Sequence, residues 1–595
     1  MGSDVSLEGD YIIVGGGTAG LVLASRLGGE PDTSIVVLEA GNHVAQDPRI
    51  TVPATWKTLM GSDADWRLRS TPQAHLNNRV IKMPQGRLLG GSSGINGLAF
   101  IAPLKANINA WEALGGKGWN WENLHPYYKR SYTLQVPDAE TKKHIGAEWL
   151  DPDVNGDSGP LKVSFPATLD SPLAKAWIDT FKTLDLVARK DPFSGEVTGA
   201  YSNLATVDAE AKTRSYSANA YGGPVARQDM QFVTDALVTR VLFEPAAEGS
   251  EVVATGVEVL FRGEVLTINA RKEVILCAGA FNTPKILELS GIGNQELLTD
   301  LGIPNLQDHL STSISFETVD GVETMDDLLR GDADAIQRAM DEYIEHRTGP
   351  MTIGGIQSSA VLPILDLHDP ASKTYMPALM DRYLGPSGPG DDRHETIRTI
   401  LARPSAPSCM MFLVPVQANL HDLRKSLISD TFQSGSFISL CLQMTLPFSR
   451  GNAHITSADP SAKQSINPNY LSHPLDIEIM ARNLLDLQEL HKIAPLSRYI
   501  KYNGRRNHPD AFLTGLESAR KYLRDTAKTS YHYCGTCAMM PREKGGVVDE
   551  RLKVYGTKNL RVCDASVFPL ITAGDIQSSV YAVAERGADI IRGVI

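Results

Sequence analysis

The apolar positions near the N-terminus follow the pattern of a strand, a turn and a helix. Tyr11 to Val14 form a short apolar run, and the glycine-rich segment 15–20 follows directly. Leu21 to Leu27 are mostly small or apolar, and Ser34 to Leu38 form a second apolar run. Short apolar runs next to glycine are typical of buried strands, and the segment between them is typical of a packed helix. The pattern therefore predicts a strand, a tight turn, a helix and a second strand.

Further along the chain, the pattern predicts more strands and one helix before about residue 311. The predicted strands cover Phe232 to Val241, Val252 to Val259, Glu264 to Ile268 and Val274 to Cys277. A predicted helix from Thr283 to Leu289 has Pro284 in its first turn and Gly291 just past its end, as helix ends favour. Met325 to His346 is predicted as helical, in a region without further glycine fingerprints. We therefore expect a second domain to begin near residue 311.

Composition and charge narrow the class of protein. The chain has 595 residues, 42% hydrophobic and 21% charged, which is enough for two or more domains. Its formal net charge of -12 and its lack of long Lys/Arg runs argue against partners such as nucleic acid or anionic membranes. No apolar run approaches the roughly 18 residues of a transmembrane helix. We expect a soluble monomer or homodimer that binds a small molecule.

The cysteines and the N-terminus bear on cellular location. The six cysteines lack the dense spacing of a disulfide framework, so we expect them to be mostly reduced. Cys534 and Cys537 form a C-x-x-C pair, but no second pair of ligands follows at zinc-site spacing, so we interpret them as packing residues and expect no metal. Residues 1–9 contain no apolar segment of a signal peptide, and no glycosylation acceptor occurs. We expect an intracellular, cytoplasmic location, although a secreted form with a removed leader stays open.

The glycine-rich segment is the first functional motif. Gly15, Gly17 and Gly20 match the pattern G-x-G-x-x-G, and Glu39 ends the second predicted strand. In a dinucleotide-binding unit, the first glycine makes the turn, the second admits a pyrophosphate and the third lets helix and strand pack. The acidic residue binds ribose hydroxyls and disfavours a 2′-phosphate. The motif predicts FAD or NAD rather than NADP.

Three further segments carry a family resemblance. Residues 86–97 read Gly-Arg-Leu-Leu-Gly-Gly-Ser-Ser-Gly-Ile-Asn-Gly, and residues 279–293 read Gly-Ala-Phe-Asn-Thr-Pro-Lys-Ile-Leu-Glu-Leu-Ser-Gly-Ile-Gly. Residues 531–582 contain His-Tyr-Cys-Gly-Thr-Cys and Gly-Asp-Ile-Gln. With the N-terminal fingerprint, these motifs resemble the glucose-methanol-choline (GMC) FAD oxidoreductases, in the branch of fungal glucose oxidase, aryl-alcohol oxidase and versicolorin B synthase.

The resemblance implies an α/β (α+β) fold with two domains. One is a Rossmann-like FAD-binding domain, and the other is a substrate domain whose antiparallel sheet, flanked by helices, covers the flavin ring. The implied FAD-binding domain is discontinuous and consists of residues 1–165, 215–310 and 530–595. The implied substrate-binding domain consists of residues 166–214 and 311–529.

The resemblance also implies which residues bind FAD. Some relatives link FAD covalently through a histidine just before the asparagine of the first signature, where this chain has Ile95. Because an alkyl side chain cannot form that link, we expect non-covalent FAD. The implied cofactor-binding residues are Gly15, Gly17, Thr18, Ala19, Gly20, Glu39, Ala40, Asn96, Gly97, Leu98, Ala99, Val238, Asp564, Ala565, Ile576 and Gln577.

His532 and Asp575 stand at the two catalytic positions that the resemblance implies. In the family, the histidine takes the hydroxyl proton of the substrate while hydride passes to flavin N5. The second position is histidine or asparagine in most members. An ionised Asp575 could not donate a hydrogen bond, and close to His532 it would raise the pKa of the imidazole. The other thirteen histidines are interpreted as core residues that bond backbone carbonyls.

Four interpretations of Asp575 stay open. It is a protonated donor in a dry pocket, or an ionised group that orients His532, as in hydrolase triads. In the third interpretation, flavin redox chemistry is lost or sidelined and His532 and Asp575 form an acid/base pair. In the fourth, Asp575 turns away and caps a helix that begins near Ile576.

The predicted function is oxidation of a primary or secondary alcohol, with His532 as the base. By family analogy, the substrate is a secondary-metabolite intermediate or an aryl or allylic alcohol. The alternative is a redox-neutral cyclase, dehydratase or lyase that uses the pair of His532 and Asp575. A binding role without catalysis is the third class. The sequence does not choose between oxidase and dehydrogenase.

Overall fold

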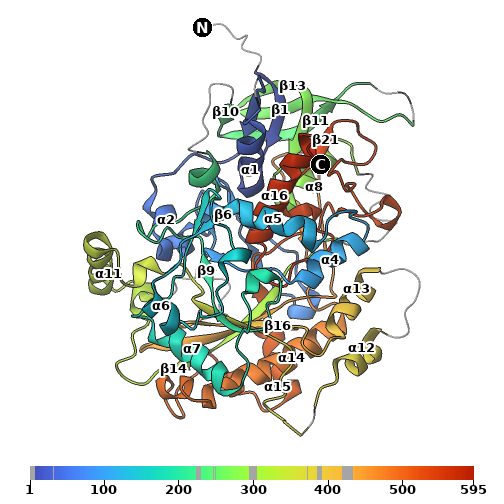
Figure 1. The fold of residues 1–595 in the computed structure, drawn as a ribbon. Helices are drawn as coiled ribbons and strands as arrows, with labels where there is room; N and C mark the ends of the chain where they lie inside the picture. Colours follow the sequence, from blue (N-terminus) through green and yellow to red (C-terminus); the bar gives the residue numbers. More distant parts are fainter. Residues whose placement is uncertain are drawn as a thin grey trace.

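A computed structural model describes most of the chain. The described residues are 7–30, 32–222, 230–245, 247, 249–293, 305–371, 373–384, 392–418 and 433–595. Most of the N-terminal segment examined for a signal peptide, residues 1–6, lies outside them. Two sheets dominate the fold, one near the top of the view in Figure 1 and the other in its lower half.

The first sheet is mixed and contains the N-terminal unit. Its strand order is β10-β2-β1-β13-β12-β11, with β21 paired to β13. Strands β10, β2, β1 and β21 run parallel to their neighbours, whereas β11, β12 and β13 form antiparallel hairpins. The strands are β1 (Glu8–Val14), β2 (Ile35–Leu38), β10 (Met230–Val233), β11 (Ala236–Phe243), β12 (Ala254–Phe261), β13 (Glu264–Leu276) and β21 (Leu560–Val562). The predicted strand, glycine turn and helix α1 (Thr18–Leu27) are confirmed.

Several predicted elements differ from the structure, and the helix predicted over 283–289 begins earlier, at Gly279. The strand predicted over 232–241 is two strands, because Asp235 adopts a left-handed backbone with φ of 57° between them. The strands predicted over 264–268 and 274–277 are one strand, β13, because it pairs with β12 up to Asn269 and then with β1, across a register shift in its polar middle. The helix predicted over 325–346 is α10 (Asp326–Arg330) and α11 (Ala333–His346), because the side chain of Asp332 caps a new start. In these last three cases, a backbone angle, a strand pairing or a helix cap set the bounds of the element, rather than the local hydrophobic pattern.

Helix α16 (Gln577–Ile591) is the centre of the helical layer on this sheet. It packs against α1 and against α5 (Trp121–Ser131), and nearly all of its residues are buried. Its first turn reaches the cavity described below, whereas its last turns lie deep in the layer. The helix therefore connects the core of the first layer to the functional site.

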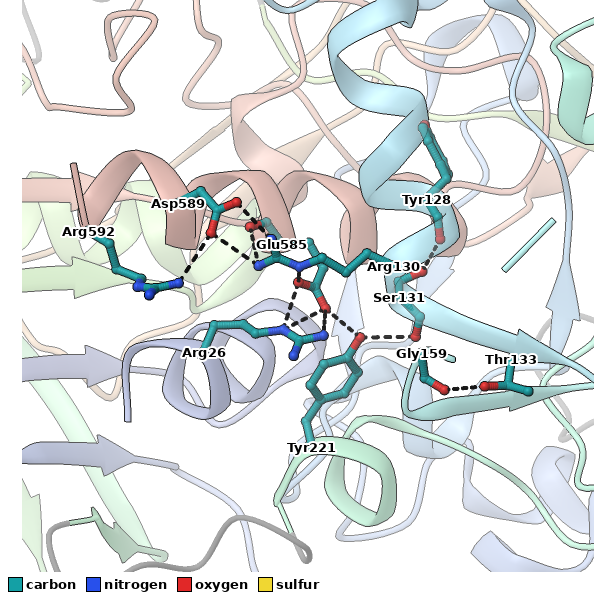
Figure 2. Close-up of polar contacts among 10 residues, drawn as sticks. All are labelled: Arg26, Tyr128, Arg130, Ser131, Thr133, Gly159, Tyr221, Glu585, Asp589 and Arg592. Carbon is teal, nitrogen blue, oxygen red and sulfur yellow. Dashed lines mark hydrogen bonds and ion pairs between the residues drawn. The ribbon is translucent and has the colours of Figure 1, made fainter. Parts of the chain in front are cut away.

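A buried carboxylate joins these three helices (Figure 2). Glu585 of α16 has a fully buried side chain and accepts hydrogen bonds from Arg26 of α1, Arg130 of α5 and the hydroxyl of Tyr221, at distances of 2.7 to 3.0 Å. Arg130 also forms an ion pair of 2.7 Å with Asp589, one turn further along α16. Both oxygens of Glu585 are thus occupied, and its negative charge faces two guanidinium groups.

Replacing Glu585 with glutamine should destabilise the protein. The substitution leaves two partly buried arginines without their shared carboxylate, which typically costs about 3–5 kcal/mol in free energy of unfolding. Urea unfolding of the holoprotein measures this loss. The control is Glu517→Gln on α15 (Leu516–Thr526), because Glu517 is 87% exposed and its change should stay within about 0.5 kcal/mol. Equal stability of the two variants would show that the buried cluster contributes nothing special.

The second sheet is antiparallel, with strand order β20-β14-β17-β16-β15-β8. One face packs against α7 (Pro172–Thr183), α14 (Pro474–Glu489) and α15. The opposite face lines the cavity. The strands are β8 (Gly199–Ser202), β14 (Leu310–Glu317), β15 (Ser358–Leu362), β16 (Cys409–Val414), β17 (Phe437–Met444) and β20 (Lys528–Thr529).

The two sheets are built from the segments predicted for the two domains, one sheet for each domain. The exact domain boundaries stay a prediction. The fold class, a mixed FAD-type sheet with a second antiparallel sheet flanked by helices, is confirmed. All six cysteines are buried and free, so Cys534 and Cys537 are packing residues, as predicted. Within the described part of the chain, no helix has the length and apolar character to cross a membrane.

Candidate active site

A single large cavity of about 690 Å³ extends from the glycine turn of the first sheet to the inner face of the second. This volume is within the usual range for small-molecule and cofactor sites. Every residue predicted to bind the cofactor or to act in catalysis lines it, except Gly20. Sequence motifs more than five hundred residues apart therefore meet in one place.

The glycine turn forms a cradle of backbone groups at the start of α1. Gly15 has φ of 104°, and a side chain there would clash with the carbonyl of Cys277. Gly20 does not line the cavity because it packs against the backbone of Gly15, the role predicted for the third glycine. Gly17 is the N-cap of α1, and no side chain caps the helix. The first N–H groups of α1, next to Thr18 in the cavity wall, are thus available to an anion.

Glu39 follows the end of β2, where backbone hydrogen bonds hold its carboxylate and leave acceptor positions free. One carboxylate oxygen accepts the N–H of Gly16 at 3.0 Å, and the other accepts the N–H of Gly41 at 2.8 Å. Burial raises the pKa of Glu39 to about 7, and the two backbone bonds oppose that rise. A carboxylate has about four acceptor positions, so two remain for hydroxyl groups. Ala40 and Val238 line the adjoining wall.

The segment from Asn96 to Ala99 is fixed by an arginine that the sequence motifs did not reveal. Arg214 is 1% exposed and donates to the carbonyls of Ile50, Ser93 and Asn96 and to Oδ1 of Asn96, at 2.7 to 3.1 Å. Burial lowers the pKa of Arg214 to about 9. Asn96 in turn donates to Oε1 of Gln577 at 2.6 Å. Arg214 thereby fixes Asn96, which in turn contacts Gln577 at the start of α16.

The C-terminal wall contains Asp564, Ala565, Ile576 and Gln577. Asp564 accepts the N–H of Gly279 at 2.9 Å and the hydroxyl of Thr283 at 2.6 Å. These bonds connect the end of β21 to the start of α8 (Gly279–Leu289). Asp564 is therefore oriented by the protein and shapes the cavity beside the glycine turn.

His532 is held by two neighbours that sequence analysis missed. Its backbone N–H donates to Asp308 at 2.9 Å, and its Nδ1 lies 3.0 Å from Nδ1 of His309. His309 is fully buried, and its Nε2 lies 3.1 Å from the carbonyl of Thr445. Both histidines flank the short β14/β20 pair, which brings them together. His309 thus bonds a backbone carbonyl, as predicted, but it also contacts the predicted base.

These contacts assign the tautomers. A carbonyl only accepts, so Nε2 of His309 carries its proton and Nδ1 of neutral His309 is an acceptor. Nδ1 of His532 must then donate to it, which leaves Nε2 of His532 with its lone pair. Burial lowers the pKa of His532 to about 3 and lowers that of His309 as well. His532 is therefore neutral, with an unprotonated nitrogen at the cavity.

Asp575 lies directly beside that nitrogen. Its Oδ1 is 3.4 Å from Nε2 of His532 and 3.4 Å from Nε2 of Gln443 on β17. Burial raises the pKa of Asp575 to about 7. The N-cap of α16 is Ile576, without a side-chain cap, so the interpretation of Asp575 as a helix cap is wrong.

Burial, rather than the charge of Asp575, sets the direction of the pKa shift of His532. An ionised Asp575 would raise the pKa of the imidazole, but both groups are buried, and burial favours the neutral form of each and lowers the pKa of His532. Burial therefore shifts Asp575 toward its protonated form, and its role as a protonated donor stays a prediction. The protonation state of Asp575 depends on an apolar and enclosed setting. That setting is formed by chain segments that only folding brings together, so the sequence gives no local signal for it.

The fold and this cavity define a class: an oxidoreductase that binds a dinucleotide beside a histidine. The chain matches the sequence model of GMC oxidoreductases, the N-terminal part over residues 9–311 and the C-terminal part over residues 447–584. This chain belongs to the GMC oxidoreductase family. The predicted family is thereby confirmed.

Individual relatives agree over nearly the full length. The chain is 33% identical to the GMC oxidoreductase family protein Mala s 12 of Malassezia sympodialis, covering 98% of this chain and 92% of that protein. It is 32% identical to a dehydrogenase of Monascus ruber, covering 98% and 96%.

Solved structures share the fold. A formate oxidase of Aspergillus oryzae, studied for its FAD modification, has a TM-score of 0.84 and 27% identity over 100% of this chain and 99% of that one. A fungal aryl-alcohol oxidase has a TM-score of 0.81 and 25% identity over 98% and 99%. FAD, rather than NAD, is therefore the cofactor, and the uncapped start of α1 and the free acceptor positions of Glu39 fit it.

Proposed function

We propose that this protein oxidises a primary or secondary alcohol with FAD, and that His532 is the base. The observation that carries the proposal is the unprotonated Nε2 of neutral His532, which faces the same cavity as the glycine cradle. A neutral imidazole can take a hydroxyl proton, whereas an imidazolium cannot. Membership of the GMC oxidoreductase family supports the part of the proposal that concerns oxidation with FAD.

The chain's own residues would hold FAD without a covalent bond. The first turn of α1 binds the pyrophosphate, Glu39 the ribose, Val238 the adenine side, and Asn96 with Gln577 the region of the flavin ring. Ile95, which precedes Asn96, is 4% exposed and has no group that could form a link. Acid precipitation should therefore release all FAD into the supernatant, and FAD retained in the pellet would contradict this assignment.

Bound FAD supplies the acceptor for the hydride that leaves the alcohol carbon. His532 accepts the hydroxyl proton at Nε2 as the oxygen becomes negative. Protonated Asp575 donates a hydrogen bond to the same oxygen, so it stabilises the developing charge. Gln443 and His309 keep the two groups in place. The 3.4 Å separation of His532 and Asp575 lets one hydroxyl contact both.

The substrate class follows from relatives and is part of the proposal. One structural neighbour is named an aryl-alcohol oxidase, and several relatives from fungi are named dehydrogenases. We infer an aryl or allylic alcohol, or a secondary-metabolite intermediate of similar chemistry. Among the described residues of the site, no contact favours the redox-neutral alternative.

Anaerobic mixing of the holoprotein with a panel of aryl, allylic and aliphatic alcohols tests the proposal. At least one alcohol should remove the visible absorbance of FAD and yield the carbonyl product in equal amount. Conversion of an alcohol without any loss of that absorbance would instead establish redox-neutral chemistry. Absence of any conversion or absorbance loss across the panel would count against alcohol oxidation.

A further inference from the structure

Two lysines line the part of the cavity that faces the second sheet. Lys57 belongs to the 3-10 helix η1 (Pro53–Leu59), and Lys528 belongs to β20. The mechanism proposed above uses neither of them. Cationic side chains in a partly closed cavity call for an anionic partner, because removing an ammonium group from water is costly.

Neither lysine has such a partner among the described residues. No ion pair or hydrogen bond joins Lys57 or Lys528 to any carboxylate in the described ranges. Asp326 is the carboxylate whose charge acts on Lys57. Its oxygens instead accept the N–H groups of Gln417 and Phe437 at 2.8 and 2.7 Å, and the hydroxyl of Thr324 at 2.9 Å.

The electrostatics of Lys57 agree with an unmet positive charge. Lys57 is partly exposed and lines the cavity. Its ammonium group lies over the ring of Trp56, 5.6 Å from the ring centroid, so it has a cation–π contact but no anionic partner among the described residues. Burial, together with the charge of Lys528, lowers the pKa of Lys57 to about 8. Two like charges in one enclosed space repel each other, and a bound anion removes both the repulsion and part of the desolvation cost.

The position of the pair separates it from the FAD cradle. The charges that act on Lys57 come from Lys528, Cys441 and Asp326, all on the side of the second sheet, and not from Glu39. Strand register places Lys528 opposite Ser311, and Ser311 opposite Gln443, which contacts Asp575. With neighbouring strands about 4.8 Å apart, the backbone of Lys528 lies roughly 10 Å from that of Gln443.

The cavity wall on the side of the second sheet contains apolar residues beside polar ones such as Ser311 and Gln417. The apolar residues are Met325, Leu329, Ile356, Phe412 and Val414. A ligand that spans from His532 to the lysines therefore meets a hydroxyl-binding end, an apolar middle and a cationic end. Two ammonium groups and the carboxylate of Asp326 leave one positive charge, which matches a monoanion.

We propose that the substrate is an alcohol with an apolar body and a carboxylate, which Lys57 and Lys528 bind while the hydroxyl reaches His532. This inference rests on the proposed alcohol oxidation for the role of the hydroxyl end. The carboxylate site itself stands on the two lysines and can be tested by binding alone. Both lysines are positioning residues for the substrate, since neither contacts His532 or Asp575.

The test uses matched probes that differ only in charge. These are 4-(hydroxymethyl)benzoate with 4-(hydroxymethyl)benzamide, and 6-hydroxyhexanoate with 6-hydroxyhexanamide. Dissociation constants are measured on anaerobic holoprotein from the shift of the visible FAD spectrum or, where the FAD is reduced, from the concentration dependence of the reduction rate. At least one carboxylate should bind about tenfold or more tightly than its amide, as expected for a charge-assisted contact.

The variants Lys57→Met and Lys528→Met should each remove most of that preference and leave the affinity for the amide within about twofold. Their FAD content and amide affinity show that they are folded. The control is Lys117→Met, an exposed lysine outside the cavity, which should keep the wild-type preference. Equal affinity for carboxylate and amide in both pairs, or a preference retained in both lysine variants, would overturn the carboxylate site.

Failure of alcohol oxidation would have a different signature. In that case the carboxylate probes still bind more tightly than their amides through the two lysines. Neither probe pair nor any other alcohol then removes the visible absorbance of FAD. The two inferences are thus separable within one set of measurements.

Discussion

Replacement of His532 with alanine should slow FAD reduction by an alcohol about 10²- to 10⁴-fold, the range for loss of a general base. The physical reason is that no other described side chain presents an unprotonated nitrogen beside Asp575. FAD should stay bound, because its proposed contacts lie on the glycine turn, Glu39 and the Asn96 segment. Anaerobic stopped-flow absorbance measures the reduction rate directly.

The matched control is His346→Ala, since His346 is exposed at the end of α11. This variant should reduce at the wild-type rate. A wild-type rate in the His532→Ala variant would remove His532 from the mechanism.

Replacement of Asp575 with asparagine should change the pH dependence more than the maximal rate. Burial raises the pKa of Asp575 to about 7, so the carboxyl group is neutral and can donate below that pH. As pH rises through 7, Asp575 ionises, the donor is lost, and a negative charge opposes the forming alkoxide. The wild-type reduction rate should therefore fall above pH 7, by up to about tenfold per unit.

Asparagine keeps a neutral donor at every pH, so the Asp575→Asn variant should lack this decline. Neither protein should show an acidic limb from His532 between about pH 5 and 7, because the pKa of that imidazole is lowered to about 3. The exposed Asp170→Asn variant is the control and should keep the wild-type profile. A wild-type rate that rises above pH 7, with the rise lost in Asp575→Asn, would instead support an ionised carboxylate that activates His532.

The N-terminal unit and the cofactor motifs could be predicted because their signals are local. A strand, a glycine turn and a helix occupy consecutive residues. Gly15 and Gly20 each stand where a side chain would clash with neighbouring backbone atoms. The boundary errors at Asp235 and Asp332 also have local causes, a left-handed backbone and a cap. A hydrophobic pattern is averaged over a window of several residues. It therefore does not register the effect of one residue and misses both boundaries.

The setting of the base could not be predicted in the same way. His309 and His532 are 223 residues apart and meet only because β14 pairs with β20. Gln443 reaches Asp575 from a third strand. The charge states of His532 and Asp575 depend on burial by these segments, so the lowered pKa of His532 could not be predicted from the sequence.

Helix α16 connects the site to the stability of the whole layer. Its first turn presents Gln577 to Asn96, and its later turns contain Glu585 and Asp589 in the arginine cluster (Figure 2). A rigid helix anchored deep in the layer keeps the cavity end in a fixed position relative to α1. Precise placement of this kind is what a hydride transfer requires, because its rate depends steeply on geometry.

The most direct measurement of the central claim compares two isotopic forms of one alcohol. The alcohol of the panel that reduces FAD fastest is prepared with hydrogen or deuterium on the carbinol carbon and mixed anaerobically with the holoprotein. The account predicts that the visible absorbance of FAD disappears as carbonyl product forms, and that deuterium slows both together. Product formation with the absorbance unchanged would contradict it.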